Sequence, residues 1–243
     1  MNVINPNISV DCVIFGYDFK DLNVLLVERT LKSNSGDLIF SDHTLLGNHI
    51  YKGEDIYDAA RRILKDLTGF EDIFLEQFRA FADPYRLKKK KDQQWLQSIG
   101  YDPDTRVITV GYYALLHCND VKIHTGNRKV SWVPVHQVNE LAFDHNLILL
   151  KALEYLRHKA MLDPVAYQLL PKKFTLSQLQ KLYEVIFNID LDKRNFRKKV
   201  ARMKYLIPLN EKQKDVAHKP AQLYMFSREV FEMTKKELFD FTI

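Results

Sequence analysis

Four charged residues at steps of four along the chain, Glu54, Asp58, Arg62 and Asp66, form the group best able to do chemistry. Residues at this spacing lie on one face of an α-helix, so the pattern predicts three carboxylates and a guanidinium in one stripe. A hard cation such as Mg²⁺ takes oxygen ligands from carboxylates, water and phosphate. The carboxylates of this stripe supply oxygen atoms of the kind that such a cation needs. The alternative is the charged face of an ordinary amphipathic core helix.

The helix that would carry this stripe is predicted from about Glu54 to Leu67. Asp55 and Asp58 fall in its first turn, where acidic side chains suit the helix dipole. Gly69 suits a left-handed C-terminal cap. The predicted buried face consists of apolar residues at helical spacing, namely Ile56, Ala59, Ala60, Ile63 and Leu67.

The segment from Gly47 to Phe70 resembles the Nudix box, whose pattern is G-x5-E-x7-R-E-U-x-E-E-x-G-U, with U an apolar residue. Anchored on Arg62 and Gly69, the pattern is matched by Glu54, Leu64 and Phe70. The sequence departs from it at one glycine and three glutamate positions, which hold Asn48, Ile63, Asp66 and Leu67.

These departures have a chemical consequence. Isoleucine and leucine carry no lone pairs for a metal, and Asp66 is one methylene shorter than glutamate. The resemblance implies an α+β fold, an α/β/α sandwich around a mixed sheet, with a ligand pocket. We expect weak or absent diphosphate hydrolysis, no catalytic residue and no bound metal, with Mg²⁺ required only if hydrolase activity is retained.

The resemblance extends beyond the box. The stretches FADPYR and DPDTRVITVGYYALL resemble the region after the box in ADP-ribose-handling Nudix proteins and their regulator relatives. The resemblance implies that Asp83, Arg86 and Arg106 lie near the pocket; the alternative is turn residues and surface ion pairs. The complete candidate effector-binding set is Arg29, Glu54, Arg62, Asp66, Asp83, Arg86 and Arg106.

Strands rich in β-branched and aromatic residues are expected to hold these side chains in place. The predicted strands are Val10–Tyr17, Leu22–Arg29, Thr44–Ile50, Ile73–Ala82, Arg106–Leu116 and Ser131–Val135, followed by a helix over Asn146–Lys159. Residues 30–43 and 87–104 are polar and are expected to be loops. Within the second, Lys88–Lys91 is expected to be solvated; the alternative is a phosphate or DNA contact.

Charge is distributed unevenly along the 243-residue chain. Residues 157–243 hold 18 Lys and Arg against 10 Asp and Glu, whereas the whole chain has a net charge of only +5. This predicts a Nudix-like effector-binding domain at 1–160, with an inter-domain helix at 146–160, and a basic domain at 161–243 that faces a polyanion. The sequence has no membrane-length apolar run and no recognisable signal peptide, and Cys12 and Cys118 are expected to be reduced, so we expect a cytoplasmic protein.

The basic domain is predicted to contain two helices joined by a short turn. Thr175 and Gln178 form a capping box at the start of the first helix. Asp192 caps the second helix, KRNFRKKVARM, whose Phe196, Val200 and Met203 face inward. A hairpin with arms at 205–209 and 223–226 follows. Its polar tip contains Lys212, Lys214, His218 and Lys219.

This order of elements favours a winged helix-turn-helix that binds double-stranded DNA. The candidate DNA-binding residues are Lys193, Arg194, Asn195, Arg197, Lys198, Arg202, Lys212, Lys214 and Lys219. The alternative is a small helical bundle with a solvated basic face.

The stretches LLPKKFTLSQLQKLYEVIF and LDKRNFRKKV are similar to the winged-helix half of the Nudix-related transcriptional regulators, the NrtR-like group. DHNLILLKALEYLRHKA resembles their inter-domain helix. The resemblance implies a homodimer that binds operator DNA and responds to ADP-ribose or a pentose-like sugar; the weak box favours the sugar, which needs no metal. Two alternatives stay open: an active Nudix hydrolase of ADP-ribose or a related nucleoside diphosphate, and a non-enzymatic module that binds RNA or a protein.

Overall fold

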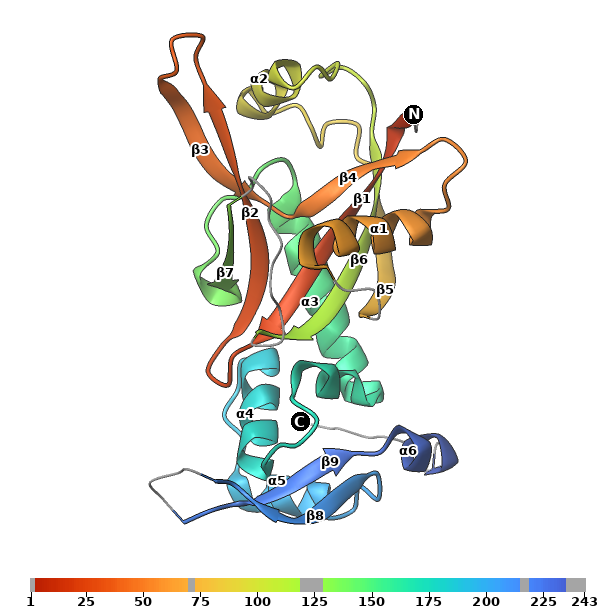
Figure 1. The fold of residues 1–243 in the computed structure, drawn as a ribbon, viewed down its shortest axis with the longest axis vertical. Helices are drawn as coiled ribbons and strands as arrows, with labels where there is room; N and C mark the ends of the chain where they lie inside the picture. Colours follow the sequence, from red (N-terminus) through yellow and green to blue (C-terminus); the bar gives the residue numbers. More distant parts are fainter. Residues whose placement is uncertain (1–2, 70–72, 119–128, 215–218, 235–243) are drawn as a thin grey trace. The chain divides into compact units, whose positions relative to one another are not determined.

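The computed structural model describes residues 3–69, 73–118, 129–214 and 219–234, which fall into two compact units (Figure 1). Unit 1 comprises residues 1–16 and 23–155, and unit 2 comprises residues 17–22 and 156–243. The division falls within helix α3 (His145–Leu162), whereas the sequence placed the domain boundary after residue 160. Phe70 of the Nudix-box pattern and His218 of the hairpin tip lie outside the described residues, as does the side chain of Leu67.

Unit 1 is built on a seven-stranded mixed sheet with a central path of β3-β2-β1-β6-β5, while β4 pairs with β1 and β7 with β2. The strands are β1 (Ile4–Tyr17), β2 (Leu22–Lys32), β3 (Leu38–Thr44), β4 (Leu46–Tyr51), β5 (Phe74–Phe81), β6 (Ile108–His117) and β7 (Val130–Pro134). All six predicted strands are present within a few residues of the predicted bounds.

The two predicted loops are wrong in part. Residues 30–43 contain the end of β2 and most of β3, which pairs antiparallel with β2 from Thr44 back to Leu38. β3 is an edge strand with mainly polar, exposed residues, so the usual alternation of buried and exposed positions is weak. Residues 87–104 contain helix α2 (Lys90–Ser98), whose short, charged sequence gives little helical periodicity.

Helices cover both faces of the sheet, as an α/β/α sandwich requires. α1 (Ile56–Thr68) begins at the N-cap Asp55 and ends at Gly69, which has the left-handed φ of 75°. Its buried Ala59, Ala60, Ile63 and Leu64 join a core with alternate residues of β6, including Tyr112. Tyr113 points to the opposite face, where it contacts Tyr155 of α3 at 5.6 Å between ring centroids.

Unit 2 contains the predicted helix-turn-helix and hairpin. α4 (Leu176–Phe187) and α5 (Lys193–Val200) precede the hairpin of β8 (Leu206–Lys212) and β9 (Gln222–Phe226), and α6 (Arg228–Thr234) follows. An aromatic core of Tyr167, Phe174, Tyr205, Phe226 and Phe231 joins the hairpin to the 3-10 helix Pro164–Leu169. The helix predicted to reach Met203 ends at Val200, since Ala201 and Arg202 already form a turn.

Two smaller findings concern cysteine pairing and membrane association. Cys12 and Cys118 form no disulfide. In the part of the chain that the structure describes, none of the helices combines the length and the apolar character needed to span a bilayer.

The capping box of α4 gives a test of unit 2. The Gln178 N–H donates to Thr175 Oγ1 (3.2 Å), and Gln178 Oε1 accepts from the Thr175 N–H (2.8 Å). Thr175→Ala should lower the free energy of unfolding by about 1 kcal/mol, because one N–H at the helix start loses its acceptor. Urea denaturation followed by circular dichroism at 222 nm measures this change. Ser177→Ala, at an exposed position in the same turn, is the control, and equal losses in both variants would contradict the role of the cap.

Candidate functional site

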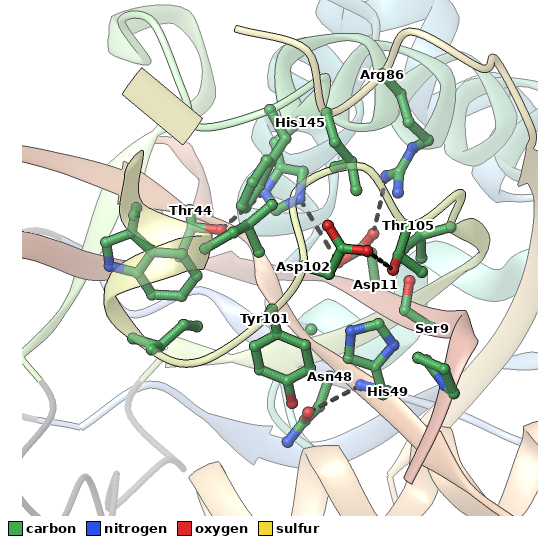
Figure 2. A pocket seen from close by; sticks show the side chains of 18 of the residues that line it. Ser9, Asp11, Thr44, Asn48, His49, Arg86, Tyr101, Asp102, Thr105 and His145 are labelled. Carbon is green, nitrogen blue, oxygen red and sulfur yellow. Dashed lines mark hydrogen bonds and ion pairs between the residues drawn. The ribbon is translucent and has the colours of Figure 1, made fainter. Parts of the chain in front are cut away.

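A cavity of about 350 Å³ in unit 1 is the candidate ligand site (Figure 2). Its walls come from β1, from the end of β3 and the first half of β4, from the turn before α2, from α2 and the loop after it, and from the start of α3. Polar side chains on the lining are Ser9, Asp11, Thr44, Asn48, His49, Arg86, Tyr101, Asp102, Thr105 and His145. Trp95 and Phe143 supply aromatic surface.

A cluster of buried charged groups forms one side of the cavity. Arg86 binds Asp144 through two hydrogen bonds of 2.8 and 3.0 Å, and its Nη2 lies 3.4 Å from Asp11 Oδ2. The Nε2 atom of His145 lies 3.6 Å from the other Asp11 oxygen. Figure 2 shows Arg86 and His145 both directed at Asp11. Arg86 is therefore already neutralised by two carboxylates, and the cavity gains no free positive charge from it.

The hydrogen bonds of His145 fix its tautomer. Its Nδ1 accepts from the Leu45 N–H at 3.0 Å and lies 2.9 Å from Thr44 Oγ1. The proton of the neutral ring is therefore on Nε2, directed at Asp11. Burial lowers the pKa of His145, while the nearby Asp11 carboxylate opposes that shift. The ring is neutral at pH 7 and presents one donor to the carboxylate.

Arg29 lies behind the aromatic wall of the cavity and does not line it. The buried guanidinium pairs with Asp42 (2.8 Å) and Asp92 (2.6 Å), and lies 5.1 Å from the Trp95 ring centroid and 4.9 Å from that of Phe143. Asp92 also accepts the Phe143 N–H at 2.9 Å. These bonds hold α2 against the segment before α3, where Phe143 has the left-handed φ of 54°.

Three lysines of the run Lys88–Lys91, at the start of α2, form ion pairs with carboxylates of unit 1. Lys88 pairs with Asp104, Lys89 with Glu140, and Lys91 with Asp42. The first two pairs are substantially exposed and stabilise the fold little.

Gly47, Asn48 and His49, at the start of the box segment, line the cavity, whereas its charged residues Glu54, Arg62 and Asp66 do not. Glu54 binds Arg62 at 2.7 and 2.9 Å, and one of its oxygens also accepts the Tyr51 N–H at 2.8 Å. The hydrogen bond from Arg62 lowers the pKa of Glu54. Asp66 is exposed. Within residues 3–69, 73–118, 129–214 and 219–234, no group of three or more His, Cys, Asp or Glu side chains has a geometry able to hold a metal ion.

Of the seven candidate effector-binding residues, only Arg86 lines the cavity. Asp83 Oδ1 accepts the Tyr85 N–H at 2.7 Å and so stabilises a turn, and Arg106 donates to the Ala82 carbonyl at 3.3 Å. Sequence reasoning missed Asp11 and His145. A single acid within the apolar strand VDCVIFGY was the available signal for Asp11, but nothing local marked His145.

The basic face of unit 2 lies on α5 and the hairpin. Phe196 and Val200 are buried, so Lys193, Arg194, Asn195, Arg197 and Lys198 all face solvent. Arg202, Lys212, Lys214 and Lys219 are exposed as well. Among the residues that the structure describes, no acidic side chain forms an ion pair with Arg194, Arg197 or Lys198. Uncompensated positive charge on an exposed helix is a feature of nucleic-acid interfaces.

Comparisons with known proteins agree with this architecture. Residues 5–155 match the model of the NUDIX domain, and residues 166–226 match that of the NrtR DNA-binding winged helix domain. The chain is 26% identical over 242 residues to the ADPR responsive transcriptional repressor NtrR of Acinetobacter baylyi, covering 98% of this chain and 88% of that protein.

Solved structures match this chain over both domains. The crystal structure of Shewanella oneidensis NrtR complexed with a 27mer DNA is 27% identical, with a TM-score of 0.71 over 90% of this chain and 93% of that one. A MutT/nudix family protein from Enterococcus faecalis shares the fold, with 24% identity and a TM-score of 0.64 over 92% and 88% of the two chains.

Fold and site together define a Nudix domain joined to a DNA-binding winged helix. The chain belongs to the Nudix family and, within it, to the NrtR-like group of proteins. The predicted family and fold class are confirmed. The individual site residues stay predictions.

The buried His145 gives a test of unit 1. Below about pH 6.5 the unfolded chain protonates this histidine, but the folded chain, with its lowered pKa, does not until a lower pH. The free energy of unfolding should therefore decrease as the pH is lowered below about 6.5, by at most about 1.4 kcal/mol per pH unit for this group. His145→Asn keeps an acceptor for the Leu45 N–H and should reduce that slope.

Tryptophan fluorescence during urea unfolding at pH 7.5, 6.0 and 5.0 measures this effect in unit 1, because both tryptophans, Trp95 and Trp132, belong to it. His43→Asn, at an exposed position, is the control. His49, whose pKa burial also lowers, contributes equally in all three proteins. A slope unchanged by His145→Asn would show that His145 is not the titrating group.

Proposed function

We propose that this protein is a transcriptional regulator that binds operator DNA through unit 2 and a small effector through the cavity of unit 1. The observation that carries the proposal is the solvent-facing positive charge of α5, within a segment that matches a DNA-binding winged helix model. The Acinetobacter relative is a transcriptional repressor, and the Shewanella relative is seen with DNA. We infer a cytoplasmic location from this function.

The proposed DNA contacts divide by chemistry. Arg194, Lys198 and Arg202 are the candidates for the major groove, where arginine and lysine recognise guanine edges. Asn195 carries an amide suited to adenine. Lys193, Arg197 and Lys199 on α5, and Lys212, Lys214 and Lys219 on the hairpin, contact phosphates, which fix position without reading sequence.

We further propose a homodimer, as a winged helix that reads a symmetric operator requires. The two half-sites would then lie about one helical turn of DNA apart, or a multiple of it.

For the effector, we propose a molecule with a free pentose ring. Such a ring occurs both in a free pentose and at one end of ADP-ribose, the effector in the name of the Acinetobacter relative. Asp11 and Asp102 offer carboxylate acceptors to sugar hydroxyls, while Trp95 and Tyr101 offer aromatic faces. A volume of about 350 Å³ lies at the lower end of the range for small-molecule sites.

The charge of the cavity lining favours a free pentose over ADP-ribose as the effector. Arg86 is the one lysine or arginine among the described lining residues, and Asp11 and Asp144 already pair with it. A diphosphate would bring further negative charge to a cavity that lacks a free cation.

We propose that no hydrolysis accompanies binding and that no metal cofactor is needed. Both oxygens of Glu54 accept hydrogen bonds from Arg62, and leucine and isoleucine replace two of the acidic positions of the box. Steady release of AMP from ADP-ribose with Mg²⁺ or Mn²⁺, reduced in Asp66→Ala, would instead support the alternative of an active Nudix hydrolase.

Replacing the α5 groove candidates tests the DNA interface. Arg194→Ala with Lys198→Ala should weaken operator binding by at least about 10-fold, because each bidentate base contact contributes roughly 1–3 kcal/mol. Fluorescence anisotropy with a labelled duplex measures this at several salt concentrations, and wild-type affinity should fall steeply as salt rises.

The matched control for this double variant is Lys20→Ala with Lys172→Ala, which removes two exposed lysines of unit 2 outside α5 and the hairpin. Undiminished affinity in the α5 variant, or a flat salt profile in the wild type, would contradict the proposed interface.

A ligand panel tests the effector. ADP-ribose, AMP, D-ribose, L-arabinose and D-xylose are added at equal concentrations in a thermal-shift assay, with Trp95 fluorescence as a second readout. A ligand at 100 times its Kd adds about 2.7 kcal/mol, which raises Tm by roughly 5–10 °C. A free pentose is expected to give this shift.

Asp102→Asn should reduce the response because it removes a carboxylate of the lining, whereas Asp83→Asn, which lies outside the lining and keeps a turn-forming acceptor, should not. A response to ADP-ribose alone would establish the other source, and a response to no compound would contradict the proposed effector class.

A further inference from the structure

Two elements, β1 and α3, contribute residues to both units. Asp11 of β1 lines the cavity, and Tyr17, the last residue of the same strand, belongs to unit 2. His145, the first residue of α3, also lines the cavity, while the helix from Leu156 onward belongs to unit 2. A change in the position of cavity residues can therefore affect unit 2 through two continuous elements, β1 and α3.

Side chains at the cavity connect β1 to the start of α3. His145 Nε2 lies 3.6 Å from Asp11 Oδ1, and Arg86 bridges Asp11 to Asp144, the residue directly before α3. A ligand hydroxyl that hydrogen-bonds to Asp11 would compete with both partners. Occupancy of the cavity is thus chemically able to alter the tie between β1 and the start of α3.

A side chain near the far end of α3 makes a hydrogen bond to the helix-turn-helix. Arg157 Nε donates to the Ile186 carbonyl at 2.7 Å. Ile186 lies in the last turn of α4, where carbonyl oxygens have no partner within the helix. A cation at this position also suits the negative end of the helix dipole.

A separate set of hydrogen bonds joins α4 to the segment before α5. The Gln180 amide donates to Glu184 Oε1 (2.9 Å) and to the Leu191 carbonyl (2.8 Å), and Glu184 Oε1 accepts the Leu191 N–H (3.3 Å). Asp192 then caps α5 by accepting the Asn195 N–H at 2.8 Å. The connection between the two helices is therefore held at both ends, and Arg157 binds the end that comes from α4.

We propose that Arg157 is the positioning residue through which effector occupancy changes the affinity of α5 for DNA. This inference rests on the proposed function. Arg157 touches neither the cavity lining nor the exposed face of α5, so it should affect the coupling between the two binding events and neither event alone.

The test compares Arg157→Met, which removes the donor, with Arg157→Lys, which keeps a cationic donor of similar length. DNA affinity is measured by anisotropy with and without saturating ADP-ribose, D-ribose, L-arabinose or D-xylose, and the affinity of the same probe for the protein is measured by calorimetry. The wild type should show at least about a 5-fold change of DNA affinity with an active probe, the lower end for allosteric coupling.

Arg157→Met should bind that probe and the ligand-free duplex within about 2-fold of wild type, yet change DNA affinity by less than about 2-fold on adding the probe. Arg157→Lys should restore most of the response. His158→Gln, at the exposed neighbouring position of α3, is the matched control and should respond as the wild type does. If Arg157→Met does not fold, Arg157→Gln takes its place with the same expectation.

A full response in a folded Arg157→Met variant would overturn the role of Arg157 and leave the proposed function intact. A wild-type protein whose DNA affinity changes with none of the probes would overturn the proposed function and this inference together. An equal loss of response in His158→Gln would assign the effect to α3 as a whole and so reject Arg157 as the specific contact.

Discussion

Unit 1 depends on the requirement that buried charges be paired. The charged side chains of Asp11, Arg86 and Asp144 are all largely removed from solvent, and each has a partner in the same cluster; the neutral ring of His145 lies 3.6 Å from Asp11. Removing one member of such a group leaves an uncompensated charge, which destabilises by about 3–5 kcal/mol. The cluster thereby fixes β1, the turn after β5 and the start of α3 in one arrangement. The cavity exists because these three segments are held there.

The same requirement explains what became of the Nudix box. Glu54 and Arg62 bind each other through two hydrogen bonds, and the second Glu54 oxygen also holds the Tyr51 N–H. The pair thus anchors the loop before α1 to the helix, a structural role that needs no metal. With Ile63 and Leu64 buried in the core, the helix packs as any amphipathic helix does. The apolar residues Ile63 and Leu64 thus contribute to the core of unit 1.

The sequence predicted what local chemistry determines, and missed what only tertiary contacts create. The caps at Gly69, Thr175 and Asp192 are local, and they appear as expected. β3 and α2 were missed since an exposed edge strand and a short charged helix leave little periodicity. The cavity could not be predicted from the sequence for a different reason. Its lining joins residues from Pro6 to His145, so no motif of fixed spacing could reveal it.

A sensor, unlike an enzyme, must bind its ligand without consuming it. In the proposed function, unit 1 of this chain binds the ligand and unit 2 binds DNA. A pocket that hydrolysed its ligand would consume the signal, whereas one that only binds reports concentration at equilibrium. Linkage then demands reciprocity: if occupancy changes DNA affinity by some factor, DNA must change effector affinity by the same factor. Arg157 joins α3 to the last turn of α4 by a hydrogen bond, so in the proposed coupling the free energy that links both equilibria passes through a defined atom pair, Arg157 Nε and the Ile186 carbonyl.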